Sequence, residues 1–107
     1  MAWTVVFLDE RVESEMQEQP GDIRARFERI KQLISEHGPR LLPPKYVKHL
    51  EGQLWELRLK GKDGIARAIY VNATAERLVI VRVFTKKTQK TPAREIKLAR
   101  DRAKEIR

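Results

Sequence analysis

The sequence contains no cysteine, only five glycines and five prolines, and no long apolar run. The absence of cysteine excludes disulfides, thiolate zinc sites and a cysteine nucleophile, and it fits a reducing compartment. No segment approaches the length needed to span a membrane, and the N-terminus lacks a signal-peptide pattern. We therefore expect a cytoplasmic protein that makes no contact with membranes.

The chain is 107 residues long and 41% hydrophobic. This length supports one modest core and is too short for two, and the apolar content favours folding over disorder. Repeats, low-complexity tracts and linkers are absent from the sequence. We therefore expect a single domain over residues 1–107.

The net charge of +8 is unevenly distributed along the chain. Residues 1–36 carry a net charge of −3, residues 37–81 carry +4 and residues 82–107 carry +7. A basic C-terminal third is typical of a protein that binds a polyanion. The alternative is a solvated helix face that lysine and arginine keep soluble.

The first third of the chain predicts one strand and two helices. Residues 3–8 are apolar and rich in β-branched and aromatic side chains, which favours a strand. Asp9 can cap a short helix that ends before Pro20-Gly21. A second helix follows, and His37-Gly38-Pro39 is a helix stop, with His37 beside the negative end of the helix dipole. Four apolar residues fall on one face of this second helix: Ile23, Phe27, Ile30 and Ile34.

The rest of the chain predicts a loop, three strands and a last helix. Residues 40–46 form a proline-bearing loop. The strands are expected at residues 54–60, 65–71 and 78–84. Thr91 can cap the last helix, with Pro92 at its first position. The expected fold is α+β in the order β-α-α-β-β-β-α, an antiparallel sheet covered by a helical hairpin and a C-terminal helix.

Three arginines lie within these predicted strands. Arg58 is on the polar face of its strand, where a solvated position is a reasonable alternative to a functional one. Arg67 falls at the same alternate positions of its strand as apolar residues. Its charge is therefore either neutralised by a carboxylate such as Glu56 or available to bind an anionic ligand. Arg82 is likewise a charged residue within the apolar run of the last predicted strand. In an antiparallel meander these side chains could converge on one cleft, where arginine suits phosphate.

The segment Phe84-Thr85-Lys86-Lys87-Thr88-Gln89-Lys90-Thr91-Pro92 places three lysines between the last strand and the last helix. Together with Lys48-His49-Leu50, Leu54-Trp55-Glu56-Leu57-Arg58 and Arg67-Ala68-Ile69-Tyr70, it resembles the phage-derived, HigB-like branch of the RelE/ParE toxin superfamily. The similarity runs over most of the chain. The resemblance implies an antiparallel sheet flanked by helices, and a type II toxin that cleaves mRNA on the ribosome without a metal or another cofactor. It also implies a helix-turn-helix antitoxin that holds the toxin inactive, in a complex that is oligomeric.

By analogy with the ribonuclease members, the site residues are basic residues of the three meander strands: Arg58, Arg67, Lys86 and Lys87. We expect further contacts with RNA from Lys45, Lys48, Arg82 and Lys90. The sequence departs from the RelE pattern at two places. Glu56 replaces a second basic residue of the first meander strand, and the tyrosine that RelE carries near the start of its terminal segment has no counterpart after Lys87.

RNA can be cut without a metal if its 2′-hydroxyl attacks the adjacent phosphate, which requires two proton transfers and stabilisation of charge on the phosphate. Arginines suit the stabilising role. His49 has a suitable pKa for proton transfer, although a structural histidine is an open alternative. Glu56 could act as the base or could hold Arg58, and a lysine would need a lowered pKa. Two other functions stay open: a gyrase-inhibiting toxin of the ParE type, and a degenerate, RNA-binding relative.

Overall fold

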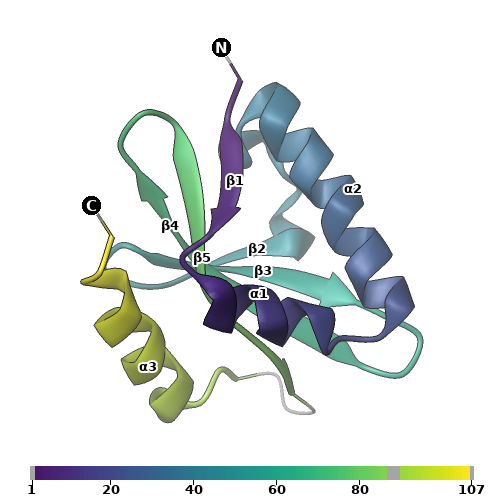
Figure 1. Cartoon of the computed structure of the whole chain (residues 1–107). Coiled ribbons are helices and arrows are strands. Elements are labelled where there is room, and N and C mark those ends of the chain that lie inside the picture. Colours follow the sequence, from purple (N-terminus) through teal and green to yellow (C-terminus); the bar gives the residue numbers. More distant parts are fainter. Residues whose placement is uncertain (1, 87–89, 107) are drawn as a thin grey trace.

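The computed structural model describes residues 2–86 and 90–106. Its helices and strands follow each other as β1 (Thr4–Phe7), α1 (Glu10–Gln17), α2 (Gly21–His37), η1 (Pro39–Leu41), η2 (Pro44–Tyr46), β2 (Val47–Glu51), β3 (Leu54–Lys60), β4 (Ile65–Ala73), β5 (Arg77–Lys86) and α3 (Ala93–Ala103), where η1 and η2 are single turns of 3-10 helix. This is the predicted α+β class, with the helical hairpin α1–α2 and the C-terminal helix in their predicted places (Figure 1). Within these residues, no helix is long and apolar enough to cross a membrane.

The sheet has five strands in the order β1-β5-β4-β3-β2. One of them, β2, was not predicted, because its half-exposed residues alternate only weakly and it forms by pairing with β3. The first strand also differs from the prediction of an antiparallel sheet: β1 runs parallel to β5, while the other pairs are antiparallel. The alternation of apolar residues indicates which face a side chain takes, but it carries no information on strand direction.

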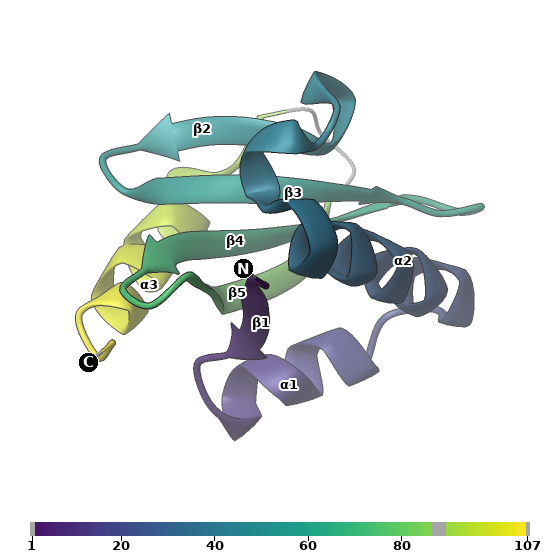
Figure 2. The same cartoon turned by 90° about the horizontal axis from the view of Figure 1, so that it is seen from above.

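Two apolar clusters cover the two faces of the sheet. The first contains Leu57, Ala68 and Leu78 of the strands with the buried side of α1 and α2, and the second contains Ile69, Val79 and Phe84 with Ala99 and Ala103 of α3. Figures 1 and 2 show α2 and α3 on opposite sides of the strands. The sheet therefore has a hairpin face, towards α1 and α2, and an α3 face.

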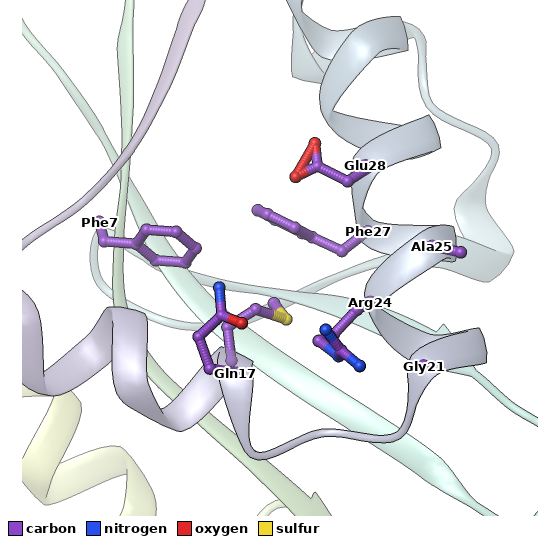
Figure 3. A pocket seen from close by; sticks show the side chains of 8 residues that line it. Phe7, Gln17, Gly21, Arg24, Ala25, Phe27 and Glu28 are labelled. Carbon is purple, nitrogen blue, oxygen red and sulfur yellow. The ribbon is translucent and has the colours of Figure 1, made fainter.

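The helices α1 and α2 leave a gap between them over the hairpin face of the sheet. A pocket of about 300 Å³ lies between α1 and α2 (Figure 3). The rings of Phe7 and Phe27 lie 5.7 Å apart at this pocket, and Arg24 and Glu28 are polar residues of its lining. At the other end of α2, Gly38 has a φ of +80°, and a Cβ there would lie 2.9 Å from Nε1 of Trp3. This close approach to Trp3 requires glycine at the helix stop.

A β-bulge between β4 and β5 determines which residues of β5 reach the α3 face. Ile69 is paired with Arg82 and Tyr70 with Ile80, so that Val81 is the extra residue. Because of the bulge, both Val81 and Arg82 lie on the α3 face, and the alternation beyond them is reversed. Phe84 consequently joins the α3 cluster opposite Arg67.

Candidate functional site

A buried carboxylate, Glu56, lies at the centre of the basic residues on the α3 face. Its side chain is 0% exposed, and Arg67 donates a hydrogen bond of 3.0 Å from Nη1 to its Oε2 atom. Thr91 donates a hydrogen bond from its hydroxyl to the other oxygen, Oε1. Glu56 thus connects β3, β4 and the segment that leads into α3.

Arg58 and Arg67 are directly opposite each other on β3 and β4. Like charges in this arrangement repel each other, and a carboxylate beside them offsets the repulsion. The Glu56 carboxylate has this position, with Nε of Arg58 at 3.6 Å and Nη1 of Arg67 at 3.0 Å. Two guanidinium groups on one carboxylate leave a net positive charge in the cluster.

The two arginines differ in their access to solvent. The side chain of Arg67 is 3% exposed, whereas that of Arg58 is 36% exposed. Of the two alternatives for Arg67, the structure contains the carboxylate partner. Arg58 is consequently the arginine of this pair that a ligand in solution can reach.

Arg82 lies on the same face but is held by two carboxylates. It binds Glu15 of α1 through Nη1 at 2.7 Å and Glu95 of α3 through Nε at 2.7 Å. The hydrogen bond to Glu95 is the main cause of a raised pKa of Arg82, with the charge of Glu15 contributing. Arg82 therefore joins α1, β5 and α3, and its charge is largely compensated.

Glu15 and Arg102 complete this network at the edge of the sheet. Strand β1 ends at Phe7 opposite Ile80, so among the described residues no strand pairs with the outer edge of β5 beyond that point. The carboxylate of Glu15 accepts a hydrogen bond of 3.1 Å from the backbone N–H of Val83, and Arg102 donates one of 2.9 Å to the carbonyl of Val81. These two side chains satisfy the backbone groups that an edge strand would otherwise expose.

His49 is separated from the arginine cluster by the sheet. It is paired with Trp55 in β2 and β3, and the two rings lie 4.7 Å apart on the hairpin face. Its Nε2 lies 2.7 Å from the carbonyl oxygen of Gly52. This placement agrees with the structural alternative for His49, because Arg58 and Arg67 are on the other face.

The predicted lysines fall into three groups. Lys48 is paired with Glu56 across β2 and β3, so it lies on the α3 face, and its side chain is exposed. Lys45 belongs to η2 at the far end of β3, where it lines a pocket together with Arg58. Lys86 is the last residue of β5, with its backbone opposite Ile65, and Lys90 is exposed shortly before α3. Lys87 lies outside the described residues.

Thr91 has a different role from the predicted one. The residue before the first turn of α3 is Pro92, and no side chain caps this helix. The hydroxyl of Thr91 binds Glu56 instead, and the residue is 4% exposed. A threonine before proline is typical of a helix start, and the sequence carried no sign that a carboxylate 35 positions earlier would be its partner. Arg102, which is 8% exposed, was likewise unrecognised as a buried residue.

In the part of the chain that the structure describes, no group of three or more His, Cys, Asp or Glu residues could hold a metal ion. The side chains described above place guanidinium, carboxylate, ammonium and hydroxyl groups on the α3 face. A half-buried arginine beside a buried carboxylate suits the binding of phosphate.

Comparison with known proteins gives a consistent family and fold. Residues 14–104 match the model of the family described as "Phage derived protein Gp49-like (DUF891)". The chain is similar to the RelE toxin in an archaeal RelE–RelB complex from Pyrococcus horikoshii, with 23% identity, a TM-score of 0.61 and coverage of 79% of this chain and 96% of that one. It is also similar to a free E. coli RelE toxin mutant, with 19% identity, a TM-score of 0.65 and coverage of 95% and 98%.

No curated protein sequence matches the chain. At these identities the two solved structures establish the fold, and the family model establishes the relationship by sequence. The family model and the two solved structures confirm the resemblance to the RelE/ParE toxin superfamily that the sequence indicated. The chain belongs to the phage-derived Gp49-like family and has the fold of the RelE toxins.

Proposed function

We propose that the chain is the toxin of a type II toxin–antitoxin system and cleaves mRNA without a metal ion, on the ribosome. The family and the RelE-like fold support a toxin and an antitoxin partner. The observation that carries the nuclease assignment is the pair of arginines around Glu56, with Arg58 open to solvent. The proposed antitoxin is a helix-turn-helix protein, bound in an oligomeric complex.

In this proposal Arg58 contacts the scissile phosphate and stabilises the charge that develops on it. Arg67 and Glu56 are positioning residues, because their mutual hydrogen bond holds the carboxylate that lies 3.6 Å from Nε of Arg58. The proton transfers are assigned to Lys86 and Lys87, since His49 lies on the hairpin face. Lys48 and Lys90 supply contacts to the RNA backbone.

The test is to map the 5′ ends of transcripts after induction of the chain without an antitoxin. Loss of one stabilising donor lowers a rate by about 10²–10³-fold, so Arg58→Ala should abolish detectable cleavage and growth arrest. The control is Arg29→Ala, which removes an exposed arginine of α2 and should leave cleavage unchanged. Normal cleavage by Arg58→Ala, with the fold intact by circular dichroism, would contradict the assignment.

One observation favours a second candidate. A buried glutamate occupies the position where the ribonuclease members carry a basic residue, and it neutralises part of the arginine pair. A toxin that inhibits gyrase, as in the ParE branch, needs no catalytic cations at this place. DNA breaks with intact transcripts after induction would establish that candidate, and unaffected growth would indicate a degenerate, RNA-binding relative.

A further inference from the structure

A second basic site lies at the C-terminal end of β3, next to the cluster of Glu56, Arg58 and Arg67 (the Glu56 cluster), with which it shares Arg58. It is a pocket of about 380 Å³ between α2, η2 and the start of β4. The residues that line it are Arg26, Lys45, Tyr46, Arg58, Lys60 and Ile65. Four of these six carry a positive charge, and no Asp or Glu is among the described residues of the lining.

The pairing of β2 with β3 explains why these residues meet. The pairing begins with Val47 opposite Leu57, so the rest of β3 extends beyond the end of β2. The chain just before Val47 is η2, which contacts β3 and brings Lys45 and Tyr46 beside this free end. Helix α2 also contacts β3 and contributes Arg26. Residues from three parts of the sequence therefore surround one opening.

The charges of this pocket are little compensated. Arg26, Lys45 and Lys60 are exposed and take part in no ion pair with another described residue. Arg58 has one contact of 3.6 Å to Glu56, and its Nε atom is buried without a hydrogen bond. Folding has thus brought together four cations with a single ion-pair partner among the described residues, the carboxylate of Glu56, and the net positive charge at this opening attracts an anionic ligand.

Tyr46 adds an aromatic surface to these cations. Its ring is half-buried, and the ammonium group of Lys45 lies 5.0 Å from the ring centre. Aromatic rings beside a basic groove are typical of sites for single-stranded nucleic acid, in which bases stack and cations bind the phosphates. An acidic peptide would use the cations alone and leave the ring unused.

We propose that this pocket binds two consecutive backbone phosphates of single-stranded RNA, with an adjacent base against Tyr46. This inference rests on the proposed function, because Arg58 belongs both to the pocket and to the Glu56 cluster. It places the RNA strand along the C-terminal end of β3, so that the strand enters at Arg26 and Lys60 and reaches the scissile phosphate at Arg58. Arg26 and Lys60 are binding residues in this scheme and take no part in the chemistry.

The test measures binding of a fluorescent single-stranded RNA to the purified chain by anisotropy over a range of salt concentrations. The variant is Arg26→Glu with Lys60→Glu, and its control is Arg29→Glu with Lys31→Glu, which makes the same charge change on α2 outside the pocket. For single strands each phosphate contact contributes about 0.7 to the slope of log K against log salt. The pocket variant should lower this slope by about 1.4 and raise Kd about tenfold at low salt, and the control should change both less.

The outcomes separate this inference from the proposed function. If the pocket variant loses RNA binding while the wild-type chain fails to cleave transcripts, the pocket is correct and the nuclease assignment is wrong. If both variants change Kd and slope equally, the pocket is not an RNA site, whether or not the chain cleaves. A Tyr46→Ala variant should weaken RNA binding, whereas displacement of a polyglutamate peptide from the pocket without any effect on RNA would identify an acidic peptide as the ligand and overturn the proposal.

Discussion

Arg67 and Glu56 form a hydrogen-bonded ion pair of 3.0 Å in which both side chains are almost completely buried. The pair joins two neighbouring strands and holds Arg58 at the edge of the cluster. Its burial makes the two partners depend on each other, because a charge left alone inside the protein is costly.

Glu56→Ala should destabilise the fold by about 3–5 kcal/mol, because the buried guanidinium of Arg67 loses its carboxylate. Urea unfolding followed by circular dichroism measures this loss. The double variant Glu56→Leu with Arg67→Met removes both charges and should recover most of the stability. A double variant no more stable than Glu56→Ala would mean that packing, rather than the unpaired charge, causes the loss.

Glu15→Ala should cost about 3 kcal/mol, because it removes the acceptor of the Val83 N–H and one partner each of Arg82 and Arg102, which keep Glu95 and the Val81 carbonyl respectively. Glu13→Ala changes an exposed residue of the same helix and should cost less than about 1 kcal/mol. The measurement is again urea unfolding. Equal losses for the two variants would show that the edge network contributes nothing.

Arg102→Ala should loosen α3 without unfolding the sheet. Arg102 connects this helix to the carbonyl of Val81 and to Glu15, and a narrow apolar stripe and the Glu95–Arg82 pair are further contacts of α3 with the sheet. Amide hydrogen exchange should become faster in α3 and change little in β3 and β4. Arg100→Ala removes a half-exposed pair with Glu51 and serves as the control. Faster exchange in all elements would contradict local opening.

The stability contributed by Asp22 should depend on pH. The backbone N–H of Lys62, 2.5 Å away, is the main cause of a lowered pKa of Asp22, and the N–H of Ile23 contributes to it. A carboxyl whose pKa is lowered on folding stabilises the protein above its ordinary pKa of about 4, and this contribution disappears as the pH falls through the lowered value. The Tm difference between wild type and Asp22→Asn should thus be present at neutral pH and shrink in acid. A difference that is constant with pH would contradict this role.

Gly61→Ala should destabilise the turn between β3 and β4. A Cβ at Gly61 would lie 2.6 Å from Cγ1 of Ile23 and 2.9 Å from Oδ2 of Asp22, so α2 or the turn must shift, at about 1–3 kcal/mol. Gly64→Ala, in the same turn, would meet only Cγ2 of Thr85 at 3.8 Å and should have little effect. Thermal unfolding compares the two variants, and equal Tm values would show that the turn accommodates both.

Much of the architecture could be predicted because it depends on local patterns. The apolar face of α2 and the alternation in β3 each predict which side chains of that element are buried, and Gly38-Pro39 predicts where α2 ends. The missed strand β2 has a weak pattern of its own and forms only because β3 offers an edge. The role of Thr91 was also missed, since its partner Glu56 is distant in sequence.

The candidate site was predictable in its residue types more than in its arrangement. The sequence indicated Arg58 and Arg67 on adjacent strands and left Glu56 as a possible partner, and the structure joins the three. The position of His49 on the hairpin face could not be predicted, because it depends on the pairing of His49 with Trp55 across β2 and β3. Arg26 and Lys60 were not singled out, since each is an ordinary exposed cation in its own element.

The sequence by itself determined the fold class, the basic character of the C-terminal third and the family to which the chain belongs. These follow from composition, periodicity and a motif, which are local properties. The tertiary structure alone decided the parallel β1, the bulge that brings Arg82 to the α3 face, the burial of Glu56 and the pocket around Tyr46. All four depend on contacts between segments that are distant in the chain, whereas a period of two in one segment specifies only which face of its strand a side chain takes.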